Sequence, residues 1–140
     1  MSRPLLESNS QKAWTVLVVD DNPSEAEPLI QRLAEVGWQV LFAASVQEAR
    51  NVVETQKPDA IICDLEMPLQ GGYKLMEAIG NNPKTHDMPF LLANRDWDFT
   101  NWSRIAGGRS ADCHVMKPYD SDTLQGVVAL LSRMFISIGS

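Results

Sequence analysis

Residues 15–23 read TVLVVDDNP, a β-branched apolar run that stops at two aspartates, an asparagine and a proline. A short apolar run bounded by turn residues predicts a strand buried on both faces, as in a parallel sheet. A helical segment follows, with apolar residues on one face and a glycine at its end: Leu29, Ile30, Leu33, Val36 and Gly37. Pro28 is expected near the first turn of this helix, because deeper inside it would remove a hydrogen bond.

The same alternation continues along the chain. Four more strands are expected, at Gln39–Ala43, Ala60–Cys63, Phe90–Ala93 and Cys113–Met116. Helical signals lie between and after them: the capping-box spacing of Ser45 and Glu48, the pair Gly71-Gly72, and an apolar stripe over residues 124–134. Strands that alternate with helices form βαβ units, so the sequence predicts an α/β fold with a doubly wound, five-stranded parallel sheet and helices on both faces. We expect residues 1–12 to be a flexible leader, 13–136 one domain, and 137–140 a C-terminal tail.

Composition excludes several classes of protein. The 140 residues carry a formal net charge of -6, which argues against a protein that grips nucleic acid directly. The same charge suits carboxylates gathered around a divalent cation, although solubility alone could explain it. Two cysteines are too few for a disulfide framework. No apolar run approaches the ~18 residues that a membrane-spanning helix needs. Residues 1–12 lack the apolar core of a signal peptide. We therefore expect a cytoplasmic protein with no membrane partner.

Polar residues that could bind a ligand or take part in catalysis follow four of the predicted strands. Asp20 and Asp21 come after the first strand, Asp64 after the third, Asn94 after the fourth and Lys117 after the fifth. The carboxyl ends of parallel strands meet at one edge of the sheet, where such folds bind ligands. Two carboxylates ~4 Å apart repel by about 4 kcal/mol at an effective dielectric near 20, so a cation must offset them, and Mg²⁺ and the lysine ammonium are the candidates. An aspartate pair after one strand is more often a turn or a helix cap, but the combination at several strand ends indicates a site that transfers a phosphoryl group to a carboxylate.

Three motifs in this order resemble the response-regulator receiver family, typified by the chemotaxis response regulator. They are VLVVDDN at residues 16–22, PDAIICDLEMP at 58–68 with Gly72 beyond, and ADCHVMKP at 111–118. The resemblance covers roughly residues 14–135 and implies a flavodoxin-like sheet with strand order 2-1-3-4-5. It also implies Mg²⁺ as the cofactor.

The resemblance assigns roles to the strand-end residues. Asp64 is implied as the phosphoacceptor. Asp21, Asp64 and the backbone carbonyl of Glu66 are implied as direct Mg²⁺ ligands, with Asp20 acting through a metal-bound water. Lys117 would contact the phosphoryl group, and its bond to Pro118 is expected to be cis.

Three positions depart from the family pattern. Asn94 stands where the family has Thr or Ser, and its amide can still donate a hydrogen bond to an oxyanion. Arg95 stands where the next residue is small, and it could cover the site or contact the phosphate. His114 replaces the aromatic switch residue of strand five, and its imidazole can titrate near neutral pH; a half-exposed strand residue with no switching role is an equal alternative.

The function expected is that of a receiver in a two-component phosphorelay. A sensor histidine kinase or a phosphotransfer protein would supply the phosphoryl group, and a downstream protein would bind the face built on strands four and five. Catalysis would be limited to self-phosphorylation and self-dephosphorylation. One alternative is an atypical receiver that acts as a phosphorylation-independent interaction module, as Asn94 and Arg95 suggest. Another is a metal-dependent phosphatase with Asp64 as nucleophile and Glu66 as a second acid, but the chain has no room for a cap domain.

Overall fold

The computed structural model describes residues 13–95 and 112–139, which contain a five-stranded parallel sheet in the order β2-β1-β3-β4-β5. The strands are β1 (Thr15–Val19), β2 (Gln39–Ala43), β3 (Ala60–Asp64), β4 (Phe90–Asn94) and β5 (Cys113–Met116). The helices are α2 (Pro23–Val36), α3 (Val46–Gln56), α4 (Gly71–Asn81) and α6 (Ser121–Gly139), with a short 3-10 turn, η1, at Pro68–Gln70. The expected fold and strand order are therefore confirmed.

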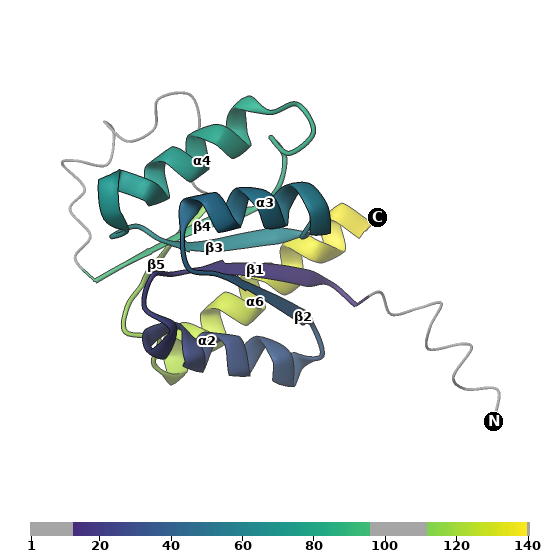
Figure 1. Ribbon diagram of the computed structural model, residues 1–140. Helices are drawn as coiled ribbons and strands as arrows, with labels where there is room; N and C mark the ends of the chain where they lie inside the picture. Colours follow the sequence, from purple (N-terminus) through teal and green to yellow (C-terminus); the bar gives the residue numbers. More distant parts are fainter. Residues whose placement is uncertain (1–12, 96–111, 140) are drawn as a thin grey trace.

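The helices form a layer on each face of the sheet (Figure 1). α3 and α4 lie on one face, and α2 and α6 lie on the other. Alternate residues of β1 belong to the two cores: Val16 and Val18 pack with α2 and α6, whereas Leu17 and Val19 pack with α3 and α4. All four are almost fully buried, which explains why the strand reads as a continuous apolar run and not as an alternating one.

The first helix begins earlier than the sequence suggests. Asn22 caps α2 by accepting a hydrogen bond from the backbone N–H of Glu25 (3.3 Å), and Pro23 occupies the first turn, where its missing N–H costs nothing. Pro28 consequently lies inside the helix, and its expected place near the first turn is wrong. Gly37 ends α2 with φ 104°, a left-handed conformation that favours glycine.

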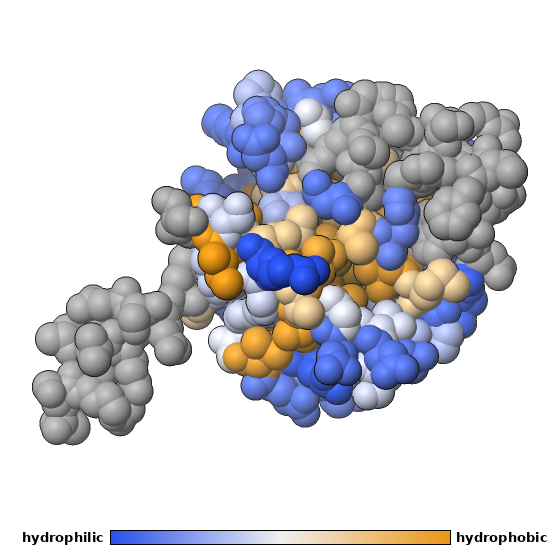
Figure 2. Space-filling view, turned by 180° about the vertical axis from the view of Figure 1, so that it is seen from behind, coloured by the Kyte–Doolittle hydropathy of each residue, from blue (hydrophilic) through white to orange (hydrophobic). Residues whose placement is uncertain are grey.

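The expected limits of the leader, domain and tail stay predictions. α6 continues to Gly139, beyond the boundary expected at residue 136, and the expected leader 1–12 lies outside the described residues. Ile136 and Ile138 are exposed near the C-terminal end of α6. The view from behind shows apolar side chains interspersed with polar ones at the surface (Figure 2). Across the described ranges, no helix is both long and apolar enough to cross a membrane.

Candidate functional site

Three carboxylates meet at the carboxyl edge of the sheet. Val19 of β1 pairs in register with Cys63 of β3, so the residues that follow each of them, Asp20 and Asp64, lie level on neighbouring strands. One oxygen from each of Asp20, Asp21 and Asp64 lies within 4.8 Å of the others. Asp20 and Asp64 are 1% and 3% exposed, and Asp21 is exposed. The predicted acidic cluster is thus present in the fold.

Lys117 crosses to this cluster from the end of β5. Its backbone N–H donates to the carbonyl of Asn94 (2.9 Å), which continues the pairing of β4 with β5. Its Nζ lies 3.1 Å from Asp20 Oδ2 and 3.3 Å from Asp64 Oδ1, and its side chain is 1% exposed. The bond to Pro118 is cis, as the resemblance implied. A buried ammonium here offsets much of the repulsion between the two buried carboxylates.

Backbone amides fix the two buried carboxylates. Asn22 N–H donates to Asp20 Oδ1 (2.9 Å), and Glu66 N–H donates to Asp64 Oδ1 (3.3 Å). Among the described residues, the hydrogen bonds and ion pairs of Asp64 use Oδ1 and leave Oδ2 without a protein partner. The side chain of Glu66 is exposed. An oriented carboxylate with one oxygen open is suited to act as a nucleophile.

The positions that depart from the family pattern lie on β4, directly after it, and on β5. Asn94 is buried at the end of β4, and its Oδ1 accepts from the backbone N–H of Arg95 (2.8 Å). His114 pairs in register with Leu92, further from the carboxyl edge than Asn94, and is half-buried. Burial lowers the pKa of His114, which favours the neutral imidazole. The expected titration near neutral pH stays a prediction.

The sequence did not point to Glu25, which the structure places at the edge of this site. Glu25 lies in the first turn of α2; its Oε1 accepts a hydrogen bond from Lys117 Nζ, and its Oε2 pairs with Arg95 Nη2. An acidic residue in a first helical turn is ordinarily explained by the helix dipole, so its type alone gave no sign of a role. The available signal was the Asn22-Pro23 cap, which fixes where the helix starts.

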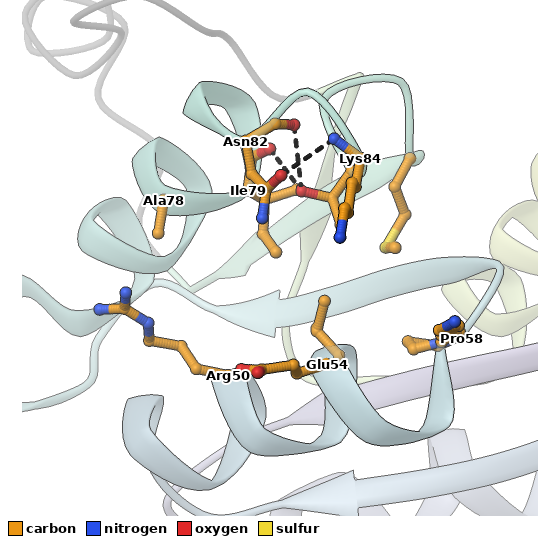
Figure 3. Close-up of a pocket in the computed structure, with 11 residues that line it drawn as sticks. Arg50, Glu54, Pro58, Ala78, Ile79, Asn82 and Lys84 are labelled. Atoms are coloured by element: carbon orange, nitrogen blue, oxygen red, sulfur yellow. Dashed lines mark hydrogen bonds between the residues drawn. The ribbon is translucent and has the colours of Figure 1, made fainter.

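A separate groove of about 660 Å³ lies between α3 and α4 (Figure 3). Its lining includes Pro58 and Met88, which precede β3 and β4, so it opens at the amino-terminal ends of these strands. Arg50, Glu54 and Lys84 also contribute to it. Because the acidic cluster is at the carboxyl ends, this groove is not part of the candidate site.

The buried, ionised carboxylate of Asp64 lowers the stability of the fold. Burial, and then the charge of Asp20, raise its pKa above the usual range, and Lys117 only partly reverses this. A carboxyl with a raised folded pKa binds its proton more tightly in the folded state, so stability is lost as pH rises from the ordinary value through the raised one. At neutral pH the ionised Asp64 therefore destabilises the protein.

We expect Asp64→Asn to raise the free energy of unfolding by about 1 kcal/mol at neutral pH without Mg²⁺, because the neutral isostere removes a buried charge. Urea denaturation in EDTA measures this. Glu77→Gln is the matched control, since it removes an exposed acid from α4. A gain in both variants, or in neither, would contradict the explanation.

The family model of the response regulator receiver domain matches residues 16–129 of this chain. The chain belongs to the response-regulator receiver family. Receivers are signalling modules of two-component systems, and they bind Mg²⁺ at an acidic pocket. Three carboxylate oxygens gathered within 4.8 Å are the hard donors that this ion prefers, so the residues of this receiver fit it.

Individual relatives agree with this assignment. Protein PilH of Pseudomonas aeruginosa is 28% identical over 111 residues, which cover 78% of this receiver and 89% of PilH. The probable transcriptional regulator ycf27 of Guillardia theta is 32% identical over 119 residues, 84% of this receiver and 45% of the relative. The receiver thus spans about half the length of several curated relatives that it matches.

Solved structures show the same fold. A putative response regulator from Chloroflexus aurantiacus has a TM-score of 0.74 at 32% identity, with 84% of this receiver and 95% of that chain covered. The chemotaxis response regulator CheY4 of Vibrio cholerae has a TM-score of 0.75 at 24% identity, with 84% and 98% covered. The family model confirms the expected family membership, and these structures confirm the fold.

Proposed function

We propose that this receiver accepts a phosphoryl group on Asp64 in a Mg²⁺-dependent reaction and thereby changes a protein-interaction surface. The observation that carries the proposal is the meeting of Asp20, Asp21, Asp64 and the Lys117 ammonium at one edge of the sheet. A carboxylate nucleophile, a set of hard oxygen ligands and a fixed cation are the groups that phosphoryl transfer requires.

The transfer itself would use the open oxygen of Asp64. Oδ2 attacks the phosphorus atom, and a new P–O bond forms as the P–N bond of a phosphohistidine, or the P–O bond of a small acyl phosphate, breaks. The bonding electron pair leaves with the imidazole nitrogen or the carboxylate, so nothing is oxidised or reduced. Lys117 would neutralise charge on the phosphoryl oxygens, and the Asn94 amide would donate where the family has a hydroxyl.

Asp21, Asp64 and the Glu66 carbonyl would hold Mg²⁺, with Asp20 acting through a water. When bound, the ion supplies charge neutralisation at the transferring phosphoryl group. The chain's own acids orient the ion, and Lys117 keeps Asp20 and Asp64 in place in its absence.

A histidine kinase or a phosphotransfer protein would be the donor, since receivers interact with histidine kinases and downstream effectors. The target would bind the face built on β4 and β5, where Asn94, Arg95 and His114 lie. The relatives' transcriptional and regulatory roles belong to longer proteins, so the output of this chain is proposed only as docking to a protein. Its cytoplasmic location stays a prediction.

Incubation with acetyl phosphate and Mg²⁺ tests the proposal. We expect an acid-stable, base-labile phosphoryl adduct by intact mass, lost in EDTA and absent from Asp64→Asn. Asp87→Asn, which changes an exposed aspartate, is the control and should be modified like the wild type. No adduct on the wild type, or an adduct that survives Asp64→Asn, would refute the proposal.

The second candidate is a receiver that binds its partner without phosphorylation. The contact of Glu25 with Lys117 and Arg95 favours it, because this carboxylate already engages the cations that a phosphoryl group would need. Magnesium titration separates the two functions: no binding at millimolar Mg²⁺ supports the second, whereas saturable binding supports the first.

A further inference from the structure

Glu25 contacts the cations of the site, yet the proposed phosphoryl chemistry gives it no role. We infer that its carboxylate is an internal competitor of the phosphoryl group: in the unphosphorylated receiver it engages Lys117 and Arg95, and the phosphoryl group formed on Asp64 displaces it from both. This inference rests on the proposed function and names a regulation of the same site.

Three carboxylates already surround the ammonium of Lys117. It donates hydrogen bonds to Asp20 (3.1 Å) and to Glu25, and it forms an ion pair with Asp64 at 3.3 Å. An ammonium has three N–H donors, so a phosphoryl oxygen that approaches Nζ competes with these carboxylates.

Of the three acceptors, Glu25 is the one that can leave. Asp20 and Asp64 are buried, and each also accepts a hydrogen bond from a backbone amide. The side chain of Glu25 is 21% exposed at the rim, where water can solvate a released carboxylate. Release is therefore less costly for Glu25 than for either buried aspartate.

Arg95 can make the corresponding exchange. Its guanidinium pairs with Glu25, and its side chain is 47% exposed, so it can turn without breaking a packed core. A guanidinium group binds the oxygens of a phosphate as readily as it binds those of a carboxylate. Because Arg95 directly follows β4, a change of its partner from Glu25 to the phosphoryl group would alter the β4–β5 face that is proposed to bind the target.

The net charge of the site supports an exchange over simple addition. The described residues here contribute four carboxylates, Asp20, Asp21, Asp64 and Glu25, against the two cations Lys117 and Arg95. Mg²⁺ balances this set. A phosphoryl group adds further negative charge, which the site accommodates by releasing Glu25 toward solvent.

Beryllofluoride, a non-covalent mimic of the phosphoryl group, tests the competition. With saturating Mg²⁺, we expect Glu25→Gln to bind it about tenfold more tightly than the wild type, as measured by ¹⁹F NMR, since a charged hydrogen-bond acceptor no longer competes. The same variant should bind Mg²⁺ more weakly, because it has lost a nearby negative charge. A purely structural role for Glu25 would not move the two affinities in opposite directions.

Glu27→Gln is the matched control. Glu27 lies on the same helix, is exposed, and accepts a hydrogen bond from Gln31 instead of a site residue (3.2 Å). It removes the same charge without the contact and should bind beryllofluoride like the wild type. If Glu25→Gln binds beryllofluoride no more tightly than Glu27→Gln, the inference is wrong, whereas the proposed function is unaffected.

Arg95→Ala in the Glu25→Gln background tests the exchange of partners. Loss of the guanidinium should weaken beryllofluoride binding severalfold, and an unchanged affinity would show that Arg95 does not reach the phosphoryl position. If neither the wild type nor Glu25→Gln binds beryllofluoride, the proposed function and this inference both fail. Binding by Glu25→Gln alone would support the competition in its strongest form.

Discussion

Lys117→Met should unfold about 3 kcal/mol more easily than the wild type in EDTA, because removal of one partner of a buried ion pair leaves the other uncompensated. The side chain is 1% exposed, and its ammonium faces three carboxylates. Methionine conserves much of the apolar stem, so the loss reports the charge and not a cavity. Mg²⁺ should restore part of the stability, since the proposed site would bind it through the same acids in the folded state. Acidification should also restore stability, because burial raises the pKa of Asp64 and its protonation removes a buried charge.

The variant should also lose most of its capture of the phosphoryl group, because the fixed cation of the site is gone. Urea denaturation with and without Mg²⁺ measures the first effect, and adduct formation with acetyl phosphate measures the second. Lys74→Met, which changes an exposed lysine of α4, should alter stability by less than about 0.5 kcal/mol. If Lys117→Met were as stable as this control in EDTA, the ammonium would not be what holds Asp20 and Asp64 together.

The fold could be predicted from the sequence because its strands are short, apolar and separated by strong turn signals. β1, β2 and β5 have the predicted bounds, and β3 and β4 each extend one residue further, to Asp64 and Asn94. Those two residues are polar, so hydrophobicity alone does not predict that they pair. The strand order followed from the family resemblance, since apolar runs alone do not specify which strands are neighbours.

The site was predictable only where its residues follow a strand. The parallel pairing of β1 with β3 places the backbones of Asp20 and Asp64 side by side, so their proximity follows from the topology of the sheet. Glu25 lies on a helix, and its approach to Lys117 depends on where α2 begins. Because Pro28 was expected near the first turn, the predicted start of α2 lay too far along the chain. With Asn22 as the cap, Glu25 falls in the first turn and faces the carboxyl edge of the sheet.

Gly72→Ala is expected to cost about 2 kcal/mol, in the range for overpacking a core. A Cβ at residue 72 would lie 2.8 Å from the backbone oxygen of Asp64 and 2.9 Å from Leu65 Cα. Backbone atoms cannot rotate away as a side chain can, so α4 or the segment after β3 must shift. The shift would occur directly at Asp64, and beryllofluoride binding should weaken by about tenfold or more, because small misplacements of reacting groups are costly.

Gly126→Ala provides the opposite expectation in the same protein. Gly126 lies in α6, and a Cβ there meets no atom within 4 Å. Alanine in a helix interior is favoured over glycine by about 0.8–1 kcal/mol, so this variant should be more stable than the wild type and bind beryllofluoride equally well. The contrast isolates the cause, since both changes add one methyl group to a helical glycine. If both variants gained stability, the close approach of α4 to Asp64 would not limit the residue at position 72, and the position of Asp64 would have to be set by β3 alone.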